Sequence, residues 1–129
     1  MECTYEYNPG ADTIEVTTNG TADAEKLVEM VRHIAAMCAE RPSANVLVDH
    51  SRLKAGKLTM DGVRTASNAT VSLKNVTGKR KCAHVVENDL QYGLVRAWEM
   101  LVEVSGYPEL EMRVFRARNE ALEWMQKRS

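Results

Sequence analysis

The sequence predicts an α/β domain with a mixed, mostly parallel sheet and packed helices. Three observations lead to this class. Segments typical of strands and of helices alternate along most of the chain. The unbroken apolar run at residues 45–49 is typical of a parallel strand covered on both faces. Residues 112–115 indicate a short buried strand that leads directly into an amphipathic helix at residues 119–125.

The chain begins with the pattern of a β-hairpin. Residues 2–7 alternate between polar and apolar side chains, and residues 13–18 do the same, with Ile14 and Val16 on one face. Asn8-Pro9-Gly10 lies between them and supplies residues that favour a turn. We therefore expect two antiparallel strands.

A helix is expected next. Asn19-Gly20 should break the second strand, and Thr21 is a good N-cap for a helix that runs to about Ala39. Pro42 prevents the helix from continuing. Apolar residues repeat along this helix at helical spacing, namely Leu27, Val31, Ile34 and Cys38. The face that they form should lie on the sheet.

The middle of the chain holds the expected central strand and the weakest helix. After the strand at residues 45–49, a polar loop is expected over residues 50–58. Thr59 can cap a helix that runs to about Lys74, although Gly62 and several short polar residues make this helix intrinsically weak.

Two further pairs of strand and helix complete the series. Residues 81–86 indicate a strand, and Asn88 or Asp89 can cap the helix that follows. That helix should end at Ser105-Gly106. Its expected apolar face consists of Leu90, Leu94, Ala97, Leu101 and Val104. With the terminal strand and helix, the order is β-β-α-β-α-β-α-β-α.

Length and composition limit the classes of function. The 129 residues fit a single domain, residues 1–129, and the net charge of -1 gives no field that would favour nucleic acid. No stretch approaches the roughly 18 apolar residues that membrane insertion needs. Three widely spaced cysteines fit reduced thiols, so the cytoplasm is the expected compartment.

Patterns for catalysis, metals and cofactors are missing from the sequence. It contains no phosphate-binding glycine loop, no metal-ligand spacing and no nucleophile elbow, so we expect a protein without a cofactor or metal that is not an enzyme. Asp49-His50-Ser51 has the residue types of a hydrolase triad, but neighbouring side chains on a strand diverge to opposite faces. His84 is expected to be a packed or hydrogen-bonded core residue.

Polar residues follow the predicted parallel strands, at the edge where open α/β sheets bind ligands. We expect Asp49, His50 and Asn88 to orient a small ligand there, with Tyr92 covering it from the adjoining helix.

The sequence also resembles a known family. The Gly20-Thr21 entry to the first helix, the strand end at residues 47–49 and the ending formed by residues 114–116 and 120–125 are similar to the SpoIIAA-like family of STAS-type domains. This resemblance implies a STAS-like fold and a small, cytoplasmic, bacterial, non-enzymatic protein. It also implies a fold relationship to antagonists of anti-sigma factors and to Sec14-like lipid-binding domains.

The resemblance leaves two functions open. The expected one is a non-catalytic binding module for a small apolar, amphipathic or lipid-like ligand, acting alone or as a homodimer. The alternative is a regulatory protein-protein interaction domain of the anti-sigma-factor-antagonist type with a protein partner. This chain lacks the usual phosphoserine motif of such domains, so Thr59 and, more weakly, Ser51 are the candidate phosphorylation sites. The simpler interpretation of Thr59 is a helix cap.

Overall fold

The computed structural model describes residues 1–127 and confirms the α/β class. Its five strands are β1 (Glu2–Asn8), β2 (Thr13–Thr21), β3 (Asn45–Lys54), β4 (Arg80–Val85) and β5 (Leu110–Phe115). Its helices are α1 (Ala24–Glu40), α2 (Met60–Ser72), the short α3 (Lys74–Thr77), α4 (Asp89–Val104) and α5 (Arg118–Gln126).

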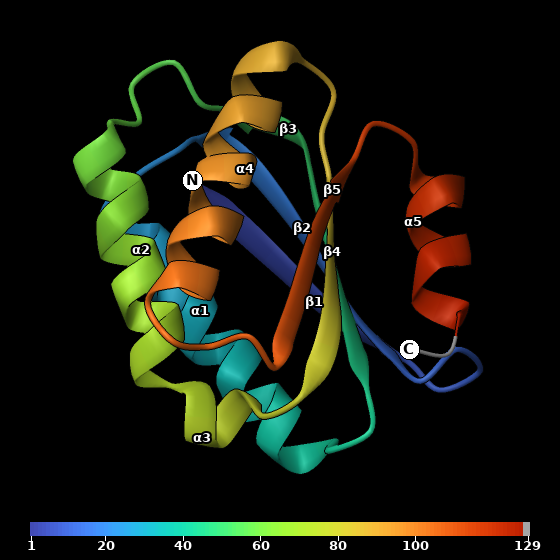
Figure 1. The fold of residues 1–129 in the computed structure, drawn as a ribbon. Coiled ribbons are helices and arrows are strands. Elements are labelled where there is room, and N and C mark those ends of the chain that lie inside the picture. Colours follow the sequence, from blue (N-terminus) through green and yellow to red (C-terminus); the bar gives the residue numbers. More distant parts are fainter. Residues whose placement is uncertain (128–129) are drawn as a thin grey trace.

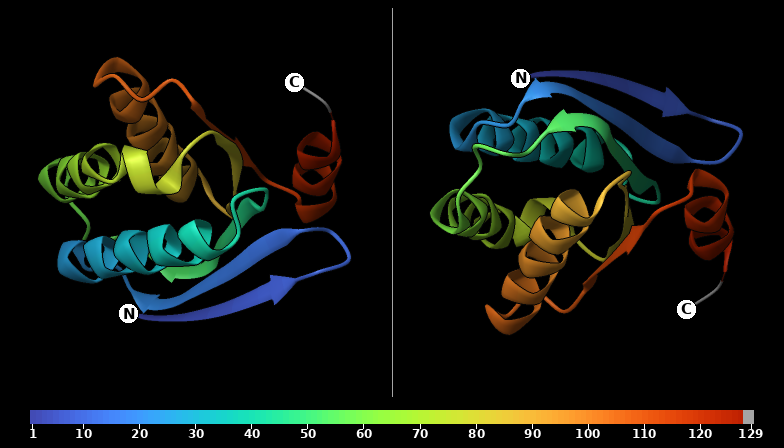
Figure 2. Two further views of the ribbon diagram at one scale, coloured as in Figure 1. Left: turned by 90° about the horizontal axis from the view of Figure 1, so that it is seen from below. Right: turned by 90° about the horizontal axis from the view of Figure 1, so that it is seen from above.

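The sheet follows the order of the chain, β1-β2-β3-β4-β5. β1 and β2 are antiparallel, and the other neighbouring strands are parallel. Because the parallel connections all advance in one direction, right-handed crossovers place their helices on the same face of the sheet. Figures 1 and 2 show α1 to α4 on that face and α5 alone on the other.

The hydrophobic core has a large and a small part. The large part lies between the sheet and the four helices and includes Ile14, Val16, Met30, Val48 and Trp98. The small part lies under α5 and consists of Leu47, Ala83, Val85, Ala121 and Met125. β3 is therefore covered on both faces, as its apolar run predicts.

β2 and β3 are longer than predicted, and the predicted cap of α1 is wrong. β2 continues through Asn19-Gly20 to Thr21, and β3 continues to Lys54, because these ends pair with each other after a register shift. Gly20 has a φ of 86°, which a residue without Cβ adopts readily. The cap of α1 is Asp23, whose side chain accepts hydrogen bonds from the backbone of Glu25 and Lys26.

Helix α2 forms an outer layer. It packs mainly on α1 and α4, and Figure 2 shows it on the side of these two helices that is turned away from the sheet. The predicted cap is confirmed, since the Thr59 hydroxyl accepts a hydrogen bond from the Gly62 amide at 3.1 Å. A Cβ at Gly62 would lie 3.3 Å from that of Ala24, so glycine allows α2 to approach the start of α1 closely.

Helix α4 is rotated relative to the predicted apolar face. Asn88 caps it, as expected, but its buried residues are Gln91, Val95, Trp98 and Val102. Leu90 is 51% exposed and Val104 is 84% exposed, so the predicted stripe lies at the boundary with solvent.

A buried arginine holds the end of α1 to the sheet. Arg80, the first residue of β4, donates hydrogen bonds to backbone carbonyls around the C-terminus of α1 and at the end of α3. These carbonyls belong to Cys38, Arg41, Pro42, Ala44 and Thr77. Helix C-termini leave carbonyl groups without intrahelical partners, and the guanidinium satisfies them here.

Candidate functional site

A chain of buried polar side chains crosses the sheet below the helices. The Thr18 hydroxyl lies 2.9 Å from Nδ1 of His50, and Nε2 of His50 lies 3.0 Å from Nδ1 of His84. Nε2 of His84 lies 3.5 Å from Sγ of Cys82. The planes of the two imidazole rings are nearly parallel, and the ring centroids are 5.2 Å apart. β2, β3 and β4 thus contribute to one continuous row.

One arrangement of protons gives every member of this row a partner. The Thr18 hydroxyl donates to the carbonyl of Asp49 at 3.3 Å, so its oxygen accepts from Nδ1–H of His50. His50 Nε2 then accepts from Nδ1–H of His84, and His84 Nε2 accepts from the Cys82 thiol. Both rings are neutral in this arrangement, and all four ring nitrogens are occupied.

Burial keeps the row uncharged. Desolvation lowers the pKa of His50 to about 4, against a smaller opposing effect from the carboxylate of Asp49. Desolvation, followed by the effect of His50, lowers the pKa of His84 well below its usual value. Desolvation also raises the pKa of the Cys82 thiol to about 12. At neutral pH the row therefore offers neither a cationic acid nor a thiolate nucleophile.

Two small hollows flank Trp98 above this row. The first, of about 30 Å³, lies between α2, α4 and the end of β3, and its lining is apolar apart from His50 and Gln91. The second, of about 40 Å³, is bordered by His84 and Cys82. Trp98 contributes to both, and its indole N–H donates to the Thr70 hydroxyl of α2 at 3.2 Å. Val63 of α2 borders the first hollow and Thr70 borders the second, so α2 covers both.

Beside the first hollow, the side chain of Gln91 joins β3 to α4. Its side-chain amide donates to the carbonyls of His50 and Leu53 at 2.9 and 2.8 Å. Its oxygen accepts from the backbone amides of Glu87 and Asn88. The end of β3 and the start of α4 are thus joined by one buried side chain.

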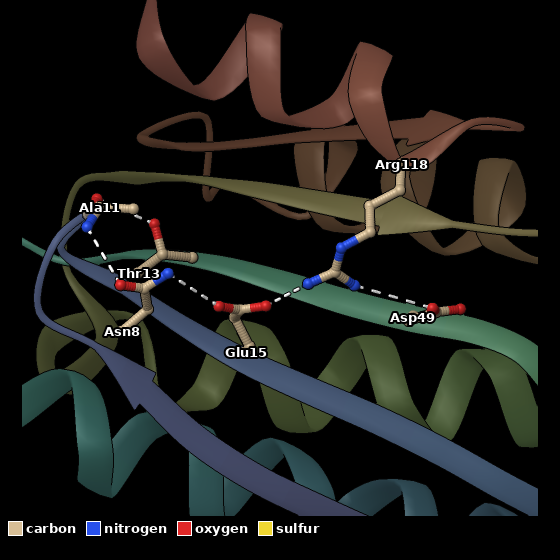
Figure 3. A network of polar contacts seen from close by, with 6 residues as sticks. All are labelled: Asn8, Ala11, Thr13, Glu15, Asp49 and Arg118. Atoms are coloured by element: carbon tan, nitrogen blue, oxygen red, sulfur yellow. Dashed lines mark hydrogen bonds and ion pairs between the residues drawn. The ribbon is translucent and has the colours of Figure 1, made fainter.

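Of the predicted ligand-binding residues, His50 faces the first hollow and Asp49 points to the opposite face of the sheet. The carboxylate of Asp49 accepts a hydrogen bond from the Ser51 amide at 2.9 Å and lies 3.8 Å from the guanidinium of Arg118. Figure 3 shows Arg118 between Asp49 and Glu15, with Asn8 on the far side of Glu15. This network connects the start of α5 to β2 and β3 across the sheet.

Asn88 and Tyr92 lie at the start of α4. Asn88 is exposed and exchanges hydrogen bonds with Gln91 in a capping box. Tyr92 is half-buried, and the guanidinium of Arg116 lies 4.8 Å from the centre of its ring. Arg116 also pairs with Asp89 at 2.6 Å. That Asp49, His50, Asn88 and Tyr92 bind one ligand remains a prediction, and of these four residues only His50 borders the first hollow.

The two candidate phosphorylation sites differ in exposure. Thr59 is exposed at the N-terminus of α2, whereas Ser51 is half-buried within β3. Phosphate at Thr59 would lie near the positive end of a helix dipole.

Three residues around the hollows were not predicted as site residues: His84, Gln91 and Trp98. His84 is a hydrogen-bonded core residue, as expected, but its pairing with His50 was missed. The signal was a histidine directly after the predicted strand at residues 45–49 and another within the predicted strand at residues 81–86. The parallel register places His84 beside Val48, two residues before His50. Within residues 1–127, no three His, Cys, Asp or Glu side chains are grouped as a metal site requires, and no helix is long and apolar enough to cross a membrane.

Comparisons with known proteins agree with this architecture. A crystal structure of an uncharacterized protein of the DUF3478 family with a SpoIIAA-like fold, from Shewanella loihica PV-4, matches with a TM-score of 0.59. The match has 19% sequence identity and covers 95% of this chain and 93% of that chain, which shows a shared fold. No curated protein matches the sequence. The model of the SpoIIAA-like family matches residues 13–126, which include β2 to β5 and all the helices, and the chain therefore belongs to the SpoIIAA-like family.

Proposed function

We propose that this domain is a non-catalytic module that binds a small apolar or amphipathic molecule between α2, α4 and the carboxyl end of β3. The observation that carries the proposal is the first hollow, whose wall is almost entirely apolar and includes Leu53, Leu58, Leu94 and Trp98. Ligand pockets are typically apolar with a few placed polar groups, and open α/β sheets bind ligands at this edge.

The hollow must open before it can hold such a molecule. Its volume of about 30 Å³ has room for one or two waters, whereas ligand pockets usually measure roughly 300–1,000 Å³. Helix α2 is the element that can move, because it packs on α1 and α4 as an outer layer and has a weakly helical sequence. Its displacement would join the hollows on the two sides of Trp98.

The first test is native mass spectrometry of the protein purified from cells, compared with its mass after denaturation. A stoichiometric apolar adduct supports the proposal. The purified protein is then titrated with octanoic, dodecanoic and hexadecanoic acid while the fluorescence of Trp98 is followed in a Trp124→Phe background. Saturable quenching, with a rise in melting temperature, is the expected result.

Matched variants on α4 locate the site. Leu94 borders the first hollow and Leu101 does not, although both are half-buried on the same helix. Leu94→Trp should weaken fatty-acid binding at least tenfold, and Leu101→Trp should change it less than twofold. Absence of an adduct together with absence of quenching by all three acids contradicts the proposal, and so does equal binding by both variants.

A second candidate, a regulatory domain that docks a protein partner, is favoured by the start of α2. Thr59 is exposed there, and the neighbouring Met60 is an apolar side chain that is 48% exposed. An apolar side chain beside a modifiable hydroxyl suits a docking surface that phosphorylation controls. Incubation with cell extract and ATP, followed by phosphopeptide mapping, tests it: phosphate at Thr59 supports this function, and an unmodified Thr59 argues against it.

A further inference from the structure

The free edge of the sheet at β5 has the features of a docking groove. Within residues 1–127, β5 pairs with β4 alone, so the backbone groups along its other side have no strand partner there. Figure 2 shows β5 as the outermost strand, with α4 and α5 on its two sides. A hollow of about 260 Å³ lies along this edge.

The hollow extends around the edge of the strand. It is bordered by four consecutive residues of β5, 110–113, whose side chains point alternately to the two faces of the sheet. Glu99 and Glu103 of α4 border it on one side, and Trp124 of α5 borders it on the other. An added strand would lie in this position, with its side chains directed alternately toward α4 and toward α5.

The charges of the groove favour a basic partner. Glu99, Glu103 and Glu111 border the groove with three carboxylates, against one bordering guanidinium, that of Arg113. The Arg113 guanidinium and the Lys81 ammonium lie 5.6 and 5.3 Å from the centre of the Trp124 ring. One oxygen of Glu99 accepts from Arg96 at 2.8 Å. The other oxygen has no hydrogen-bond partner within the described residues, but it is buried, so the Glu99 carboxylate must rotate before a cationic side chain can bond to it.

From these features we infer that β5 accepts an extended basic segment of another protein as a sixth strand. The side chains of this segment that point toward α4 are Lys or Arg and meet Glu99 and Glu103. The alternate side chains, which point toward α5, are apolar and contact Trp124. This surface is separate from the hollow between α2 and α4, so the inference does not depend on the proposed function.

A second copy of the chain fits the groove less well. In a symmetric antiparallel pair of β5 strands, the α4 helices of both copies would lie on one face of the joined sheet, and Glu99 and Glu103 would face like charges. The other free edge, β1, carries Glu2 and Glu6 among its exposed residues, so it also lacks the basic side chains that the groove requires.

The test uses a fluorescein-labelled peptide of alternating lysine and leucine, titrated with the full chain and followed by fluorescence anisotropy. Saturable binding should coincide with NMR shift changes in the amides of residues 110–115 and in the indole of Trp124. A peptide of the same sequence with alternate backbone nitrogens methylated should bind at least tenfold more weakly, because it cannot complete the ladder. An alternating glutamate and leucine peptide should not bind.

Two double variants, each of which removes two negative charges, distinguish binding in the groove from non-specific electrostatic attraction of the basic peptide. Glu99→Gln with Glu103→Gln should weaken binding at least tenfold, whereas Glu25→Gln with Glu29→Gln on α1 should change it less than threefold. If the first pair fails to fold, Glu103→Gln alone should weaken binding at least threefold. The inference is overturned if the lysine peptide does not bind, if methylation leaves its affinity unchanged, if both pairs behave alike, or if analytical ultracentrifugation shows dimers joined through β5.

Discussion

The buried histidine pair should make the protein less stable in mild acid. His50 is 2% exposed, and its pKa in the folded state is about 4, compared with 6.5 for an ordinary histidine. Between pH 6.5 and pH 4 the unfolded chain therefore binds more protons than the folded protein. The free energy of unfolding rises with pH wherever this holds, so the stability present above pH 6.5 is lost as the pH falls toward 4.

The size of the effect follows from these two values. Since one pKa unit corresponds to about 1.4 kcal/mol, His50 alone lowers the free energy of unfolding by about 2 kcal/mol between pH 7 and pH 5, and by about 3 kcal/mol at pH 4. His84 acts in the same direction, because its pKa is also lowered by burial. This loss is a large fraction of the roughly 5–15 kcal/mol that stabilises a typical domain.

The assay is urea unfolding at pH 7, pH 6 and pH 5, followed by circular dichroism. The variant that carries both His50→Leu and His84→Leu should lose at least about 2 kcal/mol less than the natural protein over this range. His33→Gln, which removes an imidazole outside the pair, serves as the control. If the double variant does not fold, His50→Gln alone should reduce the loss.

An equal loss of stability in the natural protein and in the double variant would refute this reasoning. It would mean that the pair does not exclude protons in the folded state, for example because water reaches it when α2 moves. A smaller loss in the His33→Gln control than in the double variant would likewise place the acid sensitivity outside the pair.

Three further predictions concern side chains that join elements of the fold, and urea unfolding at pH 7 checks each. Arg80→Leu should lower the free energy of unfolding by about 2–3 kcal/mol, because it leaves the carbonyls at the end of α1 without a donor. The exposed neighbour provides the control, and Lys79→Leu should change stability by less than about 0.5 kcal/mol. Gln91→Leu should lower stability by about 2 kcal/mol, since the buried carbonyls of His50 and Leu53 lose their donor; a neutral result would contradict the role of Gln91 as a tie. Thr59→Ala should lower it by about 1 kcal/mol, and Thr59→Asp should restore the cap; equal losses in both would argue against capping.

Most of the fold could be predicted because strands and helices alternate clearly in the sequence. The apolar run at 45–49 correctly indicated a strand covered on both faces, and Thr59 and Asn88 correctly indicated helix caps. The ends of β2 and β3 could not be predicted from this alternation. Gly20 breaks isolated strands, but here it is held by pairing with Leu53, a contact that exists only once both strands lie in the sheet.

The buried face of α4 shows a second limit. Counting leucines and valines predicted a stripe from Leu90 to Val104, but the burial of Gln91 and Trp98 turns the helix away from it. A glutamine is normally assigned to the solvent side. Its burial here depends on hydrogen-bond partners at the end of β3, which no helical period reveals.

The first hollow lies at the edge of the sheet where a ligand was expected, but of the four predicted residues only His50 borders it. Sequence order placed Asp49 and His50 together, whereas the alternation of a strand sends them to opposite faces. The pairing of His50 with His84 depends on the parallel register between β3 and β4. Register is set by how the two strands pack, so it cannot be obtained from either segment alone.

The hydrogen bonds that the ring nitrogens of His50 already make also determine how a ligand could be recognised in the first hollow. Both ring nitrogens of His50 are used by Thr18 and His84, and the side-chain amide of Gln91 is used by backbone groups. A ligand there would find apolar surface and few free hydrogen-bonding groups. Selection by shape and length, with little selection by head group, should follow.

A matched series of ligands tests this last expectation, which depends on the proposed function. Affinity should rise with chain length by about 0.8 kcal/mol per buried methylene, about fourfold, until the joined hollows are filled. Dodecanoic acid, dodecanol and methyl dodecanoate should bind within tenfold of one another, as measured by quenching of Trp98 fluorescence. A preference of more than a hundredfold for the acid would contradict recognition by shape, because it would require a cationic or donor group that the wall of this hollow does not present.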